Sequence, residues 1–253
     1  MFYIIHKFKH PLNWLLKISG LYIPLNILAI TLFSKRNKLS KKYIKGRGME
    51  IGALHTPLKV FNKSEVLYLD RMSVKDLRKH YPELRKFKFI KVDIVDDGEN
   101  LNKIKTSSVD FVIANHFIEH CENPIGVLKN HLRVLRKDGI IYWAVPDKRY
   151  TFDNIRQLTS NEHLEKDFKL GPQASRRDHY EEWVNKISTY KGKKAFKEIN
   201  VLIKNKYSIH FHVWTMDSFR NFLIYVKRHY NLPFRILEIT PSVNEFIVVL
   251  KKV

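Results

Sequence analysis

Three carboxylates stand where they could hold a nucleoside. Glu50, Asp70 and Asp93 each follow a short apolar run, and Glu50 and Asp70 are separated by the ~20 residues expected of an acid that binds ribose hydroxyls. The segment Gly46–Ala53 supplies a tight glycine turn where backbone N–H groups can approach a ligand. We therefore expect Asp70 to bind a ribose and Asp93 to lie near an adenine. An ordinary turn and helix-capping aspartates are the structural alternatives.

A second group of residues could activate an acceptor. His116, Glu119 and His120 would share one face of a helix at i, i+3 and i+4. Histidine suits the general base that a hydroxyl nucleophile needs, and these residues could also hold a metal that positions the hydroxyl. The spacing also matches an inverted zinc-protease motif, which their place after a predicted strand argues against. Alternatively, Glu119 and His120 satisfy backbone groups beneath a cofactor.

Two further segments carry histidines. Arg176 and Arg177 could bind a phosphate or carboxylate of the acceptor, beside Tyr180 and with His179 as the leading general base. The alternative is a charged helix start with Trp183 in the core.

In the other segment, an extended chain would place His210, His212 and Trp214 on one face, where they suit sugar stacking and proton transfer, or less readily a metal pair. The expected catalytic residues are thus His179, His212 and His116, and the expected substrate-binding residues are Arg176, Arg177, Tyr180, His210 and Trp214.

Alternating strands and helices must position these residues. Apolar runs predict strands at Met49–Ile51, Val66–Leu69, Phe89–Ile94, Val109–Ala114 and Ile140–Val145, with a C-terminal hairpin of Phe234–Thr240 and Glu245–Leu250. Helical spacing predicts helices at Val74–His80, around Asn100–Ile104, at Pro124–Arg136 and at Met216–His229. The pattern indicates an α/β fold with a doubly wound, seven-stranded, mostly parallel sheet. A long polar region, at about 147–214, reads as an acceptor-side insertion within a domain spanning 46–253.

The first 45 residues differ from the rest in composition. They hold nine Lys or Arg and no Asp or Glu, within a chain of net charge +21. The uncharged stretch from Ile18 to Ser34 is short for a membrane span and contains Pro24. We expect a helical arm, docked on the core or peripheral on an anionic membrane surface, ahead of a single-pass span. A solvated basic surface is the alternative. The lone Cys121 excludes an intrachain disulfide and suits a cytoplasmic protein.

The motifs resemble those of class I S-adenosylmethionine (SAM)-dependent methyltransferases, especially the broad type-11 group. The similar segments are Glu50–Leu54, Tyr68–Asp70, Val92–Ile94 and Ala114–His120. The resemblance implies a Rossmann-like methyltransferase fold with SAM as cofactor, its methionine part at Gly52. Where the family pattern continues Gly-x-Gly, this chain has Ala53, Leu54 and His55, which argues against a dinucleotide. Expected cofactor contacts come from Glu50, Gly52, Ala53, Asp70, Arg71, Asp93, Ile94 and Asn115.

Stretches from Glu50 to Leu58, Asp70 to Val74 and Tyr81 to Leu84 further resemble a bacterial subgroup that accompanies glycosyltransferases of surface-glycan assembly. The resemblance implies O-methylation of a sugar hydroxyl in a surface glycan or lipid-linked glycan, with that glycan as partner. An RNA methyltransferase and a catalytically silent scaffold subunit remain the alternatives, although nucleic acid is the less expected partner. A divalent metal, with His116, Glu119 and His120 as candidate ligands, is possible but not expected.

Overall fold

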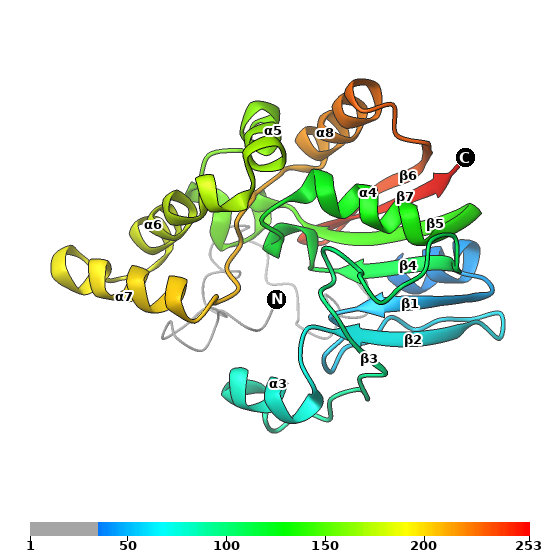
Figure 1. The fold of residues 1–253 in the computed structure, drawn as a ribbon, viewed down its shortest axis with the longest axis horizontal. Coiled ribbons are helices and arrows are strands. Elements are labelled where there is room, and N and C mark those ends of the chain that lie inside the picture. The colour runs from blue at the N-terminus through cyan, green and yellow to red at the C-terminus, as the bar shows by residue number, and fades with distance from the viewer. Residues whose placement is uncertain (1–34) are drawn as a thin grey trace.

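The computed structural model describes residues 35–253, which form one seven-stranded sheet (Figure 1). The strand order is β3-β2-β1-β4-β5-β7-β6, and β7 runs in the direction opposite to the other six strands. The strands are β1 (Arg47–Ile51), β2 (Glu65–Asp70), β3 (Ile94–Val95), β4 (Val109–Asn115), β5 (Leu135–Pro146), β6 (Phe234–Ser242) and β7 (Glu245–Lys252). The expected sheet and C-terminal hairpin are therefore confirmed.

Helices cover both faces of this sheet. They are α3 (Val74–His80), α4 (Pro124–Val134), α5 (Asn161–Leu170), α6 (Arg176–Ile187), α7 (Gly192–Lys204) and α8 (Met216–His229). Residues 35–43 are also helical. Local signals explain the ends: Asn123 accepts a hydrogen bond from the Gly126 N–H at the start of α4, and Thr215 forms a capping box with Ser218 at the start of α8.

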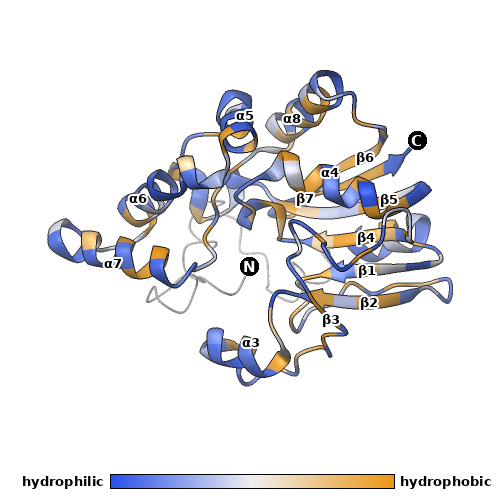
Figure 2. Ribbon diagram, in the orientation of Figure 1, coloured by the Kyte–Doolittle hydropathy of each residue, from blue (hydrophilic) through white to orange (hydrophobic). Residues whose placement is uncertain are grey.

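The apolar core has two layers, one on each face of the sheet, and different helices cover them. On one face α4 and α8 bury a large apolar cluster that includes Leu128, Trp143 and Phe222. On the other face residues 35–43 bury a smaller cluster that includes Leu39 and Tyr142. Figure 2 shows the consequence, with β4 and β7 mostly apolar and the outlying α6 mostly polar.

Two predicted elements near the third strand were wrong. Only Ile94–Val95 pair with β2, because Phe89 leaves the sheet and packs on Leu77 of α3. No helix forms around residues 100–104, where the chain turns instead. The Arg133 side chain holds this turn by donating hydrogen bonds to the carbonyl groups of Asn100, Leu101 and Ile104.

The region predicted as an acceptor-side insertion contains α5, α6 and α7. Helices α6 and α7 share a small apolar cluster that includes Trp183 and Leu202, so the core alternative for Trp183 is correct. Figure 1 shows α6 and α7 beyond the carboxyl ends of β1, β2 and β4. The insertion thus lies on the side of the sheet where a ligand is expected.

Most of the predicted arm, residues 1–34, lies outside the described residues, including the uncharged stretch from 18 to 34. Among residues 35–253, none of the helices combines the length and the apolar character that crossing a membrane requires.

Gly48 tests the packing of β1 against β4. A methyl group on its Cα would lie 2.3 Å from the Phe111 carbonyl oxygen and 2.5 Å from the Phe111 ring. We expect Gly48→Ala to lower the free energy of unfolding by about 1–3 kcal/mol in urea titrations, because overpacking a strand pair forces both strands to shift. Lys193→Ala, on an exposed position of α7, is the control. Equal stability of the two variants would contradict the close approach of the strands.

Candidate active site

A cavity of about 550 Å³ opens at the carboxyl ends of β1, β2 and β4. This volume suits a drug-sized or nucleoside ligand. Many of the residues expected from the sequence line it, namely Glu50, Gly52, Ala53, Asp70, Arg71, Asn115, His116, His120, Arg176 and Tyr180. The structure therefore brings the predicted cofactor edge and part of the predicted acceptor side together.

Gly52 makes the turn that opens the cavity. Its φ is 69°, a left-handed conformation that favours glycine, and its N–H donates to the Leu69 carbonyl oxygen at 2.9 Å. A methyl group at this position would meet no atom within 4 Å. Backbone of this kind leaves the space that a ligand needs for close approach.

Glu50 lies beside the cavity and stabilises the loop that follows β1. Both of its carboxylate oxygens accept hydrogen bonds from the Leu58 N–H, at 2.9 and 3.1 Å. Burial raises the pKa of Glu50 to about 7, against the opposing effects of the Leu58 N–H and the Arg36 charge. Glu50 thus holds the loop that follows β1 over the sheet edge.

Asp70 is the predicted ribose acceptor, and it lines the cavity at the end of β2. Burial raises the pKa of its carboxyl to about 6, and hydrogen bonds from backbone N–H groups of Arg71 and Met72 oppose this shift. Ribose hydroxyls would replace the lost water by donating to the ionised carboxylate. A buried acid with free acceptor capacity is suited to that task.

The expected adenine contact of Asp93 and the expected cofactor contact of Ile94 need correction. Neither residue lines the cavity. Asp93 is directed away, because its carboxylate accepts a hydrogen bond from the Tyr68 N–H and pairs with Lys91 at 3.1 Å.

The acids that do line this end are Asp97 and Glu99, with Gly98 between them. Burial and the neighbouring Asp97 raise the pKa of Glu99 to about 7. The missed signal was the Asp-Gly pair after a strand that ends at Val95, one residue later than predicted.

The outer wall of the cavity comes from the insertion. Arg176 forms a bidentate ion pair with Glu122, at 2.6 and 2.9 Å, and Tyr180 donates to the Tyr207 carbonyl oxygen at 2.7 Å. Phe211 also lines this wall. Arg177 does not, because it turns to the surface of α6 and pairs with Glu181 and Asn200. The predicted acceptor role of Arg177 is therefore corrected.

His116 lies at the exit of β4 with its ring between two buried carboxylates. Its Nε2 is 2.7 Å from Glu245 Oε2, and its Nδ1 is 3.4 Å from Glu119 Oε1. Glu245 in turn binds both the Nε and Nη2 groups of Arg36. His116 has a φ of 50°, which is unfavourable for a residue with a side chain and marks the position as constrained. Arg36 and Glu245 were missed because no motif links such distant segments.

The other predicted histidines lie off the cavity. His179, His210 and His212 do not line it, and neither does Trp214, which is buried against Phe219 and Phe222. This corrects their expected roles in base catalysis and sugar binding. His210 and His212 also do not act on one face, because His210 pairs with Asp153 whereas His212 lies beside Asp167.

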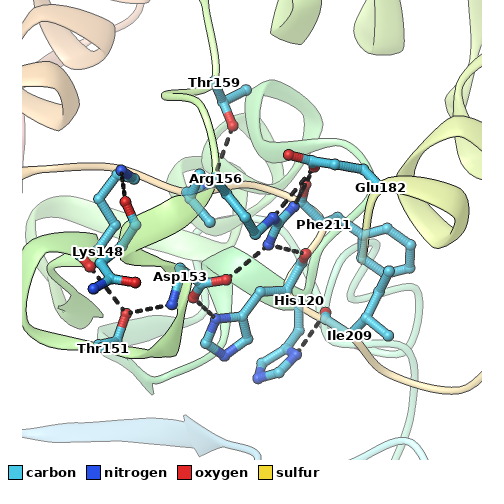
Figure 3. Close-up of polar contacts among 12 residues, drawn as sticks. His120, Lys148, Thr151, Asp153, Arg156, Thr159, Glu182, Ile209 and Phe211 are labelled. Atoms are coloured by element: carbon cyan, nitrogen blue, oxygen red, sulfur yellow. Dashed lines mark hydrogen bonds and ion pairs between the residues drawn. The ribbon is translucent and has the colours of Figure 1, made fainter. Parts of the chain in front are cut away.

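Figure 3 shows the network that fixes the segment from Ile209 to Phe211. The buried Arg156 donates to Asp153, to Glu182 and to the His210 and Phe211 carbonyl oxygens. His120 lies alongside, with its Nδ1 2.8 Å from the Ile209 carbonyl oxygen.

That carbonyl can only accept, so the His120 proton resides on Nδ1 and leaves Nε2 as an acceptor. Burial and the nearby His210 lower the pKa of His120 to about 3, and the ring is neutral at pH 7.

A metal at this end of the cavity would have a different ligand set from the expected one. Glu119, His120 and His210 have ligand atoms within 4.8 Å of one another, whereas His116 is turned to Glu245. Because His120 lines the cavity, these three residues could hold a divalent ion with a coordination position open to an acceptor.

One family model matches part of this chain, and several solved structures align with most of it. The family model of the methyltransferase domain matches residues 46–143. A Listeria monocytogenes protein, provisionally assigned as a SAM-dependent methyltransferase, has 11% identity, and the alignment covers 89% of this chain and 98% of that one with a TM-score of 0.51. A SAM-dependent methyltransferase from Aquifex aeolicus has 12% identity, with 97% and 100% covered and a TM-score of 0.49.

The plantazolicin methyltransferase BpumL bound to SAH, the demethylated form of SAM, has 15% identity, with 89% and 82% covered and a TM-score of 0.43. No curated protein matches the sequence. Residues 46–143 are thus similar to methyltransferase domains, and this part of the chain includes Glu50, Gly52 and Asp70 of the cavity.

Asp70→Asn tests the cofactor edge. Loss of charge-assisted hydrogen bonds to a ribose should cost about 1.5–3 kcal/mol, roughly 10–100-fold in the Kd for SAH by calorimetry. In the wild type, affinity should fall as pH drops through about 6, because the protonated Asp70 accepts less well.

Asp93→Asn is the matched control, since Asp93 lies off the cavity, and its affinity should stay unchanged. Equal weakening of the two variants would contradict the assignment.

Proposed function

We propose that this protein is a SAM-dependent methyltransferase and that it methylates a hydroxyl group of a sugar in a surface glycan or a lipid-linked glycan. The observation that carries the proposal is His116, which lines the cavity while Glu245 holds its Nε2 at 2.7 Å. A hydroxyl nucleophile needs a base, whereas a neutral amine does not. A histidine oriented by a buried carboxylate is the arrangement that supplies one.

The tautomer of His116 follows from its partner. Arg36 keeps Glu245 ionised, and with His116 it lowers the pKa of Glu245 to about 2 although burial opposes this. An ionised Glu245 accepts the Nε2 proton of His116, which leaves Nδ1 as the ring nitrogen that can take a proton. Glu119 Oε1, 3.4 Å from Nδ1, would stabilise the imidazolium that forms. Glu245 is thus a positioning residue that presents His116 as a base.

The reaction then needs few protein groups. When bound, SAM supplies a methyl group on a positively charged sulfur. His116 Nδ1 would take the proton of the sugar hydroxyl as its oxygen accepts the methyl group. SAM held at Gly52 and Asp70 would supply that methyl group and leave as SAH. The Nε2 of the neutral His120 can accept a hydrogen bond from a second hydroxyl of the sugar. This bond would fix the orientation of the sugar ring.

The charges around the cavity favour a sugar over RNA. The lining is balanced rather than basic: its acids are Glu50, Asp70, Asp97, Glu99 and Glu122, and its bases are Arg36, Arg71, Arg176 and Lys206. A phosphate backbone requires a basic surface, whereas a neutral sugar binds to mixed donors, acceptors and aromatic rings. Tyr180, Tyr207 and Phe211 supply the rings on the outer wall.

The glycan class rests on the resemblance to bacterial methyltransferases that accompany glycosyltransferases. A precursor carried by a lipid would suit an enzyme whose basic first 45 residues approach an anionic membrane surface.

Incubation of the protein with methyl-labelled SAM and bacterial glycan or glycolipid extracts tests the acceptor class. We expect label in an alkali-stable methyl ether of a sugar, identified after hydrolysis by mass spectrometry. Total RNA and protein from the same cells are the matched alternatives. Label confined to either of them would refute the sugar acceptor.

His116→Gln and Glu245→Gln test the base. Removal of a general base should lower kcat by roughly 10²–10⁴-fold. Glu245→Gln should lower kcat with little change in KM through the lost orientation of His116, and it should also lower the free energy of unfolding, because Arg36 is left buried without its partner. SAH affinity should stay near that of the wild type in both variants. His229→Gln, on an exposed position of α8, is the control. Full activity of His116→Gln would show that His116 is not the general base.

A further inference from the structure

Four ligand-type side chains converge at a second place, outside the cavity. They are His163 and Asp167 on α5, His179 on α6, and His212 on the chain leading to α8. One ligand atom from each lies within 4.8 Å of the others. His163 and Asp167 share a helix face at i and i+4, so the helix itself sets their spacing.

The distances within the cluster match a four-coordinate ion. Metal–ligand bonds of about 2.0–2.1 Å in a tetrahedron place the ligand atoms roughly 3.4 Å apart. Here His163 Nε2 is 3.1 Å from His179 Nε2, and Asp167 Oδ2 is 3.2 Å from His163 Nε2. Asp167 Oδ2 is also 3.7 Å from Nε2 of both His179 and His212.

The cluster is poorly satisfied without a cation. Asp167 and His212 are fully buried, and neither Asp167 Oδ2 nor His212 Nε2 has a hydrogen-bond partner among the described residues. Leaving such groups unpaired in the interior is costly. The second oxygen of Asp167 accepts a hydrogen bond from the Ser175 hydroxyl, which fixes the carboxylate with Oδ2 toward the three rings. Such an outer contact is typical of a metal ligand.

We propose that His163, Asp167, His179 and His212 bind one zinc-class divalent ion in a closed, structural site. Three imidazoles and one carboxylate suit Zn²⁺, and the four protein ligands leave no position for a reacting group. His163 is the most exposed ligand, with a side chain 34% accessible, and it gives the ion a way in. This inference is independent of the proposed reaction.

The site would organise the acceptor wall. His179 precedes Tyr180, and His212 follows Phe211, and both neighbours line the cavity. The Phe211 N–H also donates to the Glu119 carbonyl oxygen at 2.8 Å. An ion bound by α5, α6 and this segment would fix the position of the outer wall of the cavity relative to the sheet.

The test begins with the full-length protein, purified without chelator and analysed for bound metal. We expect about one equivalent of zinc per chain, which a strong chelator removes with a drop in Tm. Reloading with Co²⁺ alone should give the visible absorption of a four-coordinate ion. Folded protein that takes up neither Zn²⁺ nor Co²⁺ would overturn the proposal.

Variants assign the ion to these ligands. His163→Gln, at the most exposed ligand, should keep the fold and weaken Zn²⁺ binding by more than the roughly 10–100-fold typical of an outer-shell loss. His163→Cys should retain the ion and add a thiolate-to-Co²⁺ charge-transfer band, which a merely structural substitution would not produce.

His210→Gln, in the neighbouring group with Glu119 and His120, is the matched control and should still bind about one equivalent of zinc per chain. Zinc retained by His163→Gln but lost from His210→Gln would place the ion elsewhere and refute the site.

Discussion

The buried ion pair of Arg36 with Glu245 joins parts of the chain that are far apart in sequence. Arg36 lies in the helix of residues 35–43, Glu245 begins β7, and His116 ends β4. Breaking such a pair by removing one partner typically costs about 3–5 kcal/mol, because the other charge is left buried. The position of His116 in the cavity therefore depends on the helix of residues 35–43 through the ion pair of Arg36 with Glu245. The same ion pair joins that helix to β7 in the core.

Much of the fold followed from local patterns. Apolar runs and cap residues sufficed for β1, β2, β4, the hairpin, α3 and α8, because each buries a regular stripe or alternation. The third strand did not follow, since Phe89 has the composition of a strand residue but packs on α3. That error displaced the adenine assignment to Asp93, whereas the cavity is lined by Asp97 and Glu99.

The histidines show where sequence reasoning ends. Spacing alone could not separate His116, which faces the cavity, from His179 and His212, which face each other in the interior. Their partners come from other segments: Glu245 for His116, and Asp167 and His163 for the inner pair. Such contacts depend on how α5 and α6 fold back over the sheet, and no local motif encodes that path.

The pair α6 and α7 has an apolar cluster of its own, and the segment of residues 207–212 that follows it contacts Glu119 and His120 just after β4. Its side chains contribute to the outer wall, while the opposite edge of the cavity is built by β1, β2 and the turns that follow the strands. Under the proposed function, changes in this helical pair would alter the acceptor without altering SAM binding. Relatives with the same sheet and a different helical pair would be expected to modify different molecules, and exchanging that pair is a direct route to new specificity.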